Sequence, residues 1–120
     1  MTTIEESAFF GCTGLTGLQL NEGLQSIGKT AFYGCSSLTN VYIPDGVIEI
    51  GDYAFGNCAK LYNVHIPESV TKCGLYLFSG SADVALEEQQ TINIFVKQNS
   101  WMDQNFDTVF SGTKCTKVYY

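Results

Sequence analysis

The sequence contains no arginine, and its six basic residues are all lysines, set against twelve acidic residues. The formal net charge is therefore −6 at pH 7. Proteins that bind nucleic acids or anionic membranes carry clustered basic side chains, which concentrate positive potential on one face. The shortage of basic residues argues against both kinds of partner.

Long apolar runs are also missing, because no stretch approaches the roughly 18 apolar residues of a membrane-spanning helix. The chain shows neither a signal peptide nor a lipidation motif. Membrane insertion is therefore not expected. The missing signal does not fix the compartment, because a repeat begins at Ile4 with no capping segment before it, and we expect a piece of a longer array.

The chain also lacks the residue sets that enzymes use. It has one histidine, His65, no glycine-rich phosphate loop, and no recognisable nucleophile with its base. We therefore expect no enzymatic activity and no cofactor.

What the sequence does contain is a repeat of 23 residues, whose clearest copy runs from Ile27 to Glu49. Steps of 23 recover three columns: Ile4, Ile27, Ile50 and Cys73; Ala8, Ala31, Ala54 and Leu77; Phe9, Phe32, Phe55 and Phe78. Such a period is typical of leucine-rich and related solenoids, in which each coil buries its apolar face only against its neighbours. We predict one solenoid over residues 1–120, with repeats at 4–26, 27–49, 50–72 and 73–96 and a partial repeat at 97–120.

Each repeat predicts two extended segments. Leu38, Val41 and Ile43 alternate as in a half-buried strand, and Pro44 suits its exit because proline has no N–H to donate. Stacked copies predict an α/β or mainly β solenoid with a parallel sheet of about five strands. Second short strands are expected on the far side, at 47–50 and 70–73, followed by a helical or 3-10 turn.

The residues after this turn predict a left-handed backbone, because glycine and asparagine tolerate a positive φ best. They are Gly11, Gly34, Asn57 and Gly80. The phenylalanine column beside them predicts a stacked aromatic spine inside the solenoid.

The C-terminal third departs from the repeat. An insertion at about 85–91 is predicted, because residues 93–96 restore the pattern of 40–43 after it. The apolar spacing between Trp101 and Phe110 predicts one longer helix near 101–110, with Ser100 as its N-cap. Residues 115–120 align with 38–43 and predict a fifth strand.

The string I-G-x-x-A-F-x-G-C-x-x-L-x-x-V-x-I-P, present almost intact at 27–44 and with Asn57 for glycine at 50–67, resembles the BspA-like (Treponema pallidum type) leucine-rich repeat family. The resemblance implies an extracellular or cell-surface protein of bacteria or protist parasites. It also implies adhesion to host extracellular matrix or cell-surface proteins, and no catalytic residues.

Residues that alternate with the buried strand positions should form two outward columns on the sheet. One comprises Gln19, Tyr42, His65, Phe95 and Tyr119; the other comprises Gly17, Asn40, Asn63, Asn93 and Lys117. Aromatic side chains offer large contact areas at low entropic cost, so this face is the candidate site for a protein ligand. The alternative is that the aromatics only stabilise the sheet by cross-strand pairing.

Cysteines and carboxylates suggest weaker sites. Cys12, Cys35 and Cys58 are one coil apart with parallel side chains, which disfavours a disulfide and favours buried thiols. Cys73 and Cys115 are also expected at core positions, and no spacing resembles a zinc site. A column of Glu22, Asp45 and Glu68 either bridges Ca²⁺ or forms a solvated acidic edge.

These observations favour a non-catalytic protein-binding or adhesion module. Two alternatives stay open: a structural spacer whose function lies in other domains, and a homo-oligomer that self-associates through exposed solenoid ends.

Overall fold

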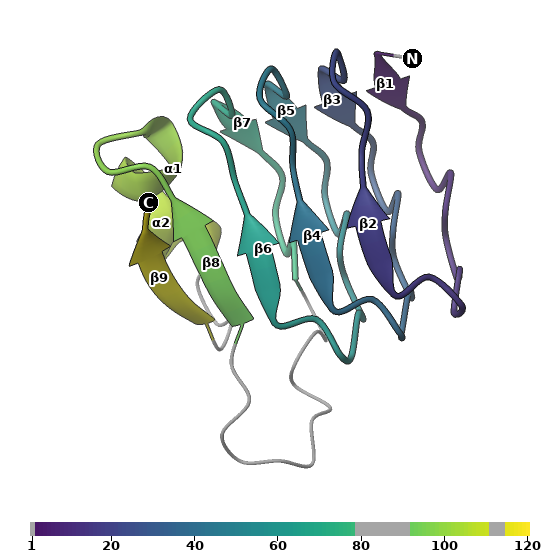
Figure 1. Cartoon of the computed structure of the whole chain (residues 1–120). Coiled ribbons are helices and arrows are strands. Elements are labelled where there is room, and N and C mark those ends of the chain that lie inside the picture. The colour runs from purple at the N-terminus through teal and green to yellow at the C-terminus, as the bar shows by residue number, and fades with distance from the viewer. Residues whose placement is uncertain (1, 79–91, 111–114) are drawn as a thin grey trace.

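The computed structural model describes residues 2–78, 92–110 and 115–120. The chain winds into a parallel β-solenoid with two sheets, as Figure 1 shows. The first sheet contains β1 (Thr3–Ile4), β3 (Ser26–Ile27), β5 (Glu49–Ile50) and β7 (Lys72–Cys73). The second contains β2 (Gly17–Gln19), β4 (Asn40–Tyr42), β6 (Asn63–His65), β8 (Ile92–Val96) and β9 (Cys115–Tyr119). The predicted five-stranded parallel sheet and the second short strands are confirmed.

The strand register follows the repeat. Asn40 pairs with Asn63, an offset of 23 residues, and the same offset joins the other strands up to β7. Between β6 and β8 the offset rises to 30, because Asn63 pairs with Asn93. The difference equals the length of the predicted insertion at about 85–91, which itself lies outside the described residues and stays a prediction.

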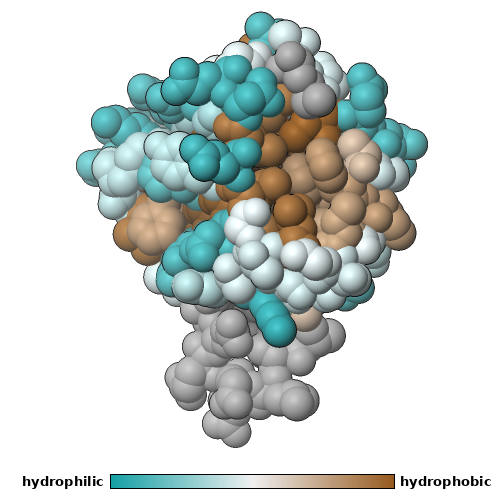
Figure 2. All heavy atoms as spheres, turned by 45° about the vertical axis from the view of Figure 1, so that its right-hand side comes forward, coloured by the Kyte–Doolittle hydropathy of each residue, from teal (hydrophilic) through white to brown (hydrophobic). Residues whose placement is uncertain are grey.

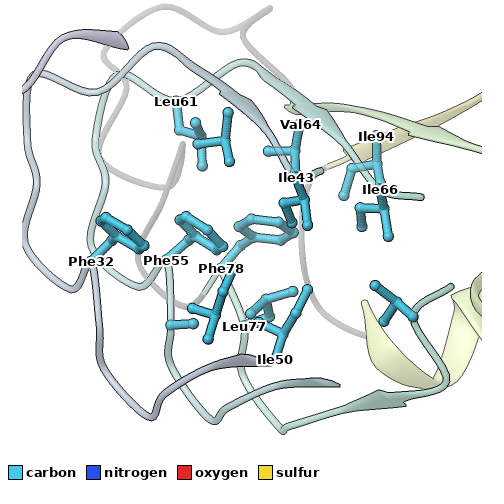
Figure 3. Close-up of a cluster of buried hydrophobic side chains, with 14 of the residues drawn as sticks. Phe32, Ile43, Ile50, Phe55, Leu61, Val64, Ile66, Leu77, Phe78 and Ile94 are labelled. Atoms are coloured by element: carbon cyan, nitrogen blue, oxygen red, sulfur yellow. The ribbon is translucent and has the colours of Figure 1, made fainter. Parts of the chain in front are cut away.

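The phenylalanine column forms the predicted spine inside the solenoid (Figure 3). The ring centroids of Phe32 lie 5.1 Å from Phe9 and 5.3 Å from Phe55, with nearly parallel planes. Phe110 extends the stack beyond Phe78, with its centroid 5.4 Å away. Around the spine, the inward residues of β4, β6 and β8 are almost wholly buried. The rings and the aliphatic side chains therefore make one continuous core.

The turn segment differs from the prediction. Where a helical or 3-10 turn was expected, the described residues form successive hydrogen-bonded turns. Alternate amides point in two directions: Phe32 N donates to Ala54 O of the next coil at 2.8 Å, whereas Tyr33 N donates to Thr30 O at 3.1 Å. In a helix every amide would donate to a carbonyl of its own coil. In these turns, every second amide instead donates to a carbonyl of the next coil.

Two backbone positions per turn are left-handed. The predicted set is confirmed at Gly11, Gly34 and Asn57, whereas Gly80 lies outside the described residues. The sequence reasoning missed a second set without glycine: Ser7, Thr30, Tyr53 and Tyr76, with φ of 54–59°. A left-handed conformation costs a non-glycine residue roughly 1–2 kcal/mol. Each of the first three donates its amide to the next coil, which offsets this cost.

The C-terminal end of the core is covered by two one-turn helices instead of the single helix predicted near 101–110. These are α1 (Trp101–Gln104) and α2 (Phe106–Val109). The break falls at Asn105, whose Nδ2 donates to Trp101 O at 2.7 Å. Ser100 is confirmed as the N-cap, because its Oγ accepts from Asp103 N at 3.2 Å.

The N-terminal end is open in the part of the chain that the structure describes. Figure 2 looks toward this end and shows apolar side chains gathered in its middle, with polar ones around them. Leu15, Leu18 and Leu20 of the first coil are only partly buried, and Phe10 is 56% exposed. The two ends of the solenoid are therefore unlike each other.

The spine predicts where truncation is most costly. Phe32→Ala should lower the free energy of unfolding by about 3–5 kcal/mol, because it opens a cavity between two stacked rings. Phe10→Ala removes an exposed ring of equal size and should cost far less. Urea unfolding of both variants measures the difference, and equal losses would contradict a stabilising spine.

Candidate functional site: the outer face of the five-stranded sheet

Two rows of side chains cover the outer face of the five-stranded sheet. Val41, Val64 and Ile94 point inward and are at most 2% exposed, so their strand neighbours point outward. The register places Tyr42 beside His65, and His65 beside Phe95. It likewise aligns Asn40, Asn63 and Asn93. The structure thus brings together six of the residues predicted for this face.

The outward rings form a contiguous stack. Tyr42 and His65 have centroids 4.4 Å apart, and His65 and Phe95 are 5.9 Å apart, each pair being close to parallel. Tyr120 joins them, with its ring 4.1 Å from His65 and its hydroxyl donating to Ile66 O at 3.0 Å. We call these four residues the ring stripe. Sequence reasoning missed Tyr120, which was aligned with the inward Ile43.

The asparagine row is a hydrogen-bonded ladder. Asn93 Nδ2 donates to Asn63 Oδ1 at 3.2 Å, and Asn63 Nδ2 donates to Asn40 Oδ1 at 3.0 Å. Asn40 Nδ2 then donates to Thr39 Oγ1 at 3.1 Å. An amide nitrogen carries two N–H groups, so the ladder leaves each residue one donor for a ligand.

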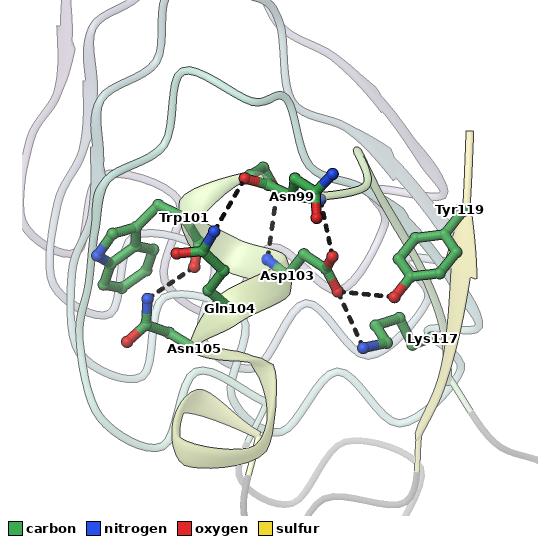
Figure 4. Close-up of polar contacts among 8 residues, drawn as sticks. Asn99, Trp101, Asp103, Gln104, Asn105, Lys117 and Tyr119 are labelled. Atoms are coloured by element: carbon green, nitrogen blue, oxygen red, sulfur yellow. Dashed lines mark hydrogen bonds and ion pairs between the residues drawn. The ribbon is translucent and has the colours of Figure 1, made fainter.

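Lys117 and Tyr119 were predicted on this face, and that prediction is wrong. In β9, Lys117 pairs with the inward Ile94, and Val118 pairs with Phe95. A shift of one residue moves every side chain of a strand to the opposite face. Lys117 and Tyr119 instead reach Asp103 of α1: Nζ lies 2.9 Å and the hydroxyl 3.0 Å from its Oδ1 (Figure 4).

Asp103 holds this end of the sheet in place. Its other oxygen, Oδ2, accepts from the backbone amide of Asn99 at 2.8 Å. That amide, followed by Lys117, lowers the pKa of the Asp103 carboxyl below its usual value. The carboxylate therefore stays charged at neutral pH and joins α1 to β9 through Lys117 and Tyr119.

Two hollows flank the exposed ring of Tyr42. The first, about 260 Å³, is lined by Leu18, Asn40, Val41, Tyr42, Asn63, His65 and Phe95. The second, about 450 Å³, is lined by Gln19, Leu20, Glu22, Tyr42, Pro44 and Asp45. Gln19, predicted beside Tyr42, thus contributes to the second hollow. Gly17, in register with Asn40, adds no side chain at the first coil.

His65 occupies the middle of the ring stripe as a neutral ring. Burial lowers its pKa from the usual 6.5, and the nearby Asp45 carboxylate opposes this only in part. Its buried Nδ1 has no hydrogen-bond partner among the described residues. At neutral pH the ring therefore behaves as a stacking surface.

The acidic column forms no compact cluster. Within residues 2–78, 92–110 and 115–120, no group of three His, Cys, Asp or Glu side chains is arranged to hold a metal ion. Binding of Ca²⁺ by Glu22, Asp45 and Glu68 stays a hypothesis. The three carboxylates remain an exposed acidic row at the exits of β2, β4 and β6.

The cysteines have structural positions. Cys35 and Cys58 are wholly buried, and their thiols donate to Phe9 O and Phe32 O, each at 3.3 Å. Cys73 and Cys115, expected in the core, are only partly buried. Burial nevertheless raises the pKa of Cys73 to about 12, so its thiolate is scarce at neutral pH. That disfavours a role as nucleophile or metal ligand.

Comparison with protein families gives a match over nearly the whole chain. The family model of the BspA-type leucine-rich repeat region, in six copies, matches residues 1–107. Comparison with curated proteins gave no match. Among the described residues, no helix has the length and apolar character needed to cross a bilayer.

Solved structures share the fold. A leucine-rich repeat protein from Bacteroides ovatus is 28% identical with a TM-score of 0.75, and the match covers 98% of this chain and 28% of that one. The Treponema pallidum leucine-rich repeat protein is 26% identical with a TM-score of 0.55, covering 79% and 52%. The pneumococcal vaccine antigen PcpA, at 24% identity and a TM-score of 0.67, covers 82% and 23% and supports the fold alone. The chain thus spans from 23% to 52% of the length of these proteins.

The lowered pKa of His65 predicts how stability depends on pH. When the pH falls below 6.5, the usual pKa of histidine, His65 binds a proton in the unfolded chain more readily than in the folded protein. The free energy of unfolding should therefore fall as the pH drops from about 7 to 5. His65→Gln should flatten this slope, as measured by urea unfolding across that range. Asp103 does not interfere, because its contribution is lost only as the pH falls below about 3.8.

Proposed function

The chain belongs to the BspA-type leucine-rich repeat family, and on that basis we propose that it is a non-catalytic recognition module. It binds a protein ligand through the outer face of the five-stranded sheet. The observation that carries the proposal is the ring stripe beside the 260 Å³ hollow over β4 and β6. Leucine-rich repeat proteins generally bind proteins, and this surface has the chemistry for it.

The physical support lies in how the rings are presented. Tyr42 is 57% exposed, and stacking against His65 fixes its ring. A ring held in place loses little further entropy when a partner covers it, which is why aromatic side chains dominate binding energies. The asparagine ladder beside it supplies oriented N–H donors. One face therefore offers rings for apolar contact and N–H donors that can orient a ligand.

The repeat fold is generally a non-enzymatic scaffold, and we infer the same role here. The single imidazole is stacked between rings, with no carboxylate or hydroxyl bonded to its buried nitrogen among the described residues. The raised pKa values of Cys35, Cys73 and Cys115 leave little thiolate for nucleophilic attack.

We infer an extracellular or cell-surface location, with a host extracellular matrix or cell-surface protein as ligand. The family assignment supports this. The acidic surface, with a net charge of −6, is compatible with partners that carry basic segments.

One observation favours a second candidate function, self-association. The N-terminal end exposes apolar side chains of the first coil, including Phe9 and Phe10 (Figure 2). Such a surface is stabilised when another molecule covers it. A mass that rises with concentration in light scattering supports this candidate; a constant monomer mass removes it.

A binding screen tests the principal proposal. The protein is screened against extracellular matrix proteins and host-cell surfaces, beside a variant carrying Tyr42→Ala, His65→Ala and Phe95→Ala. The affinity of this variant for the ligand should fall by roughly tenfold or more, because these residues form the centre of the contact. The matched control removes exposed apolar side chains elsewhere: Phe10→Ala, Leu75→Ala and Tyr76→Ala.

Melting temperatures of both variants separate folding from binding. A lower melting temperature with unchanged binding means that the rings only stabilise the sheet. If the control variant loses binding and the ring variant keeps it, the site lies elsewhere on the solenoid. Absence of binding by the folded protein favours the structural spacer.

A further inference from the structure

The two hollows on the outer face share one wall. Tyr42 lines both of them. Residues 40–42 of the same coil line the first hollow, and residues 42, 44 and 45 line the second. The hollows are therefore neighbours that share Tyr42: the first extends over β4, β6 and β8, and the second lies over the residues that follow β2 and β4. We call the two hollows together the groove.

The halves of this groove differ in chemistry. The first is lined by Leu18, Val41 and the rings of His65 and Phe95, with two asparagine amides at its edge. The second carries the carboxylates of Glu22 and Asp45. An apolar side chain thus suits the first hollow, and a cation suits the second.

The carboxylates of the second hollow have no cationic partner within the chain as described. The ion pairs among the described residues are Lys72–Glu49 and Lys117–Asp103, both away from this groove. No lysine lines either hollow, and Glu22 and Asp45 are exposed. His65 adds no positive charge, because burial keeps it neutral at pH 7. The groove therefore presents uncompensated negative charge beside an exposed aromatic face.

We propose that the partner of the outer face is a basic protein segment that lies extended across the two hollows. It places an apolar or aromatic side chain in the first hollow and a lysine or arginine side chain in the second. The cation contacts the Tyr42 ring and pairs with Asp45 and Glu22. This inference rests on the proposed function, since it specifies what that face binds.

The geometry sets the spacing within the segment. On the coil of β4, the first hollow is lined by residues 40–42 and the second by residues 42, 44 and 45. Three residues of an extended chain span about 10 Å. An extended segment in either chain direction therefore carries its cationic side chain two or three residues from the apolar side chain that fills the first hollow. Arginine fits better than lysine, because its planar group stacks on tyrosine while bonding a carboxylate.

Fluorescence anisotropy with defined peptides tests the proposal. The probe is a capped, fluorescein-labelled peptide of glycine and serine with one tryptophan and, three positions later, one arginine. The matched probe carries the neutral isostere citrulline in place of arginine. The proteins are the unmodified chain, Glu22→Gln with Asp45→Asn, and the control Glu5→Gln with Glu6→Gln, which removes the same charge from exposed residues of the first coil.

The arginine peptide should lose affinity by about tenfold or more on Glu22→Gln with Asp45→Asn, because a charge pair next to an aromatic face is lost. The citrulline peptide should bind the unmodified chain as weakly as the arginine peptide binds the variant with Glu22→Gln and Asp45→Asn. The Glu5→Gln, Glu6→Gln control should stay within about twofold, since exposed charges at a distance are largely screened.

Several results overturn the proposal: equal losses on both charge variants, equal binding of the two peptides, or no binding of the arginine peptide. So does a neutral oligosaccharide that binds the ring stripe irrespective of Glu22 and Asp45. Failure here is distinct from failure of the proposed function. A protein ligand that depends on Tyr42, His65 and Phe95 but ignores the two carboxylates keeps the outer face as the site and removes only the cationic segment.

Discussion

The hydrogen-bonded stacking of each coil on the next is the constraint on which this structure depends. It requires backbones to approach closely, and glycines permit this: a Cβ at Gly51 would lie 2.5 Å from Lys29 N, and one at Gly28 would lie 2.7 Å from the carbonyl carbon of Glu5. No real side chain tolerates such distances. The same stacking brings phenylalanine rings into face-to-face contact in the interior.

The outer face is a product of the same constraint. Parallel register carries each outward residue to the same place on successive coils, so one aromatic per repeat is enough to build a stack of rings. The contacts among Tyr42, His65 and Phe95 therefore need no loop or cleft to position them. Where the coil exits its strand, the repeat also places one carboxylate per coil. Adjacent rows of different chemistry thus arise from a single unit of sequence.

Much of the fold was predictable because the repeat encodes it locally. The spine, the paired strands and the glycine or asparagine turns each follow from residues that recur every 23 positions. The non-glycine left-handed residues such as Thr30 were not predictable, because bonds between coils override their backbone preference. Seven of the nine residues predicted for the sheet face lie on it, including Gln19, which pairs with Tyr42 and lines the second hollow.

The wrongly predicted residues of the sheet face lie in β9, where the chain no longer follows the regular repeat. Alignment placed Lys117 and Tyr119 outward, but the register of β9 on β8 is shifted by one residue, and both side chains contact a single carboxylate on α1. Asp103 belongs to no repeat column, so no periodic argument includes it. Tyr120 then reaches the outer face as a consequence of the shifted register. The shifted register thus accounts both for Lys117 and Tyr119, which leave the face, and for Tyr120, which joins it.

The asparagine ladder gives this face a direction. Asn93 and Asn63 each donate toward the preceding coil, so their two amide dipoles point the same way and add, whereas Asn40 donates to Thr39 of its own coil. Their positive ends face β2 and their negative ends face β9. The two edges of the sheet therefore differ in electrostatic potential. A polar molecule lying across the strands therefore has one favoured orientation. In the reversed orientation its partial charges meet amide groups of the same sign.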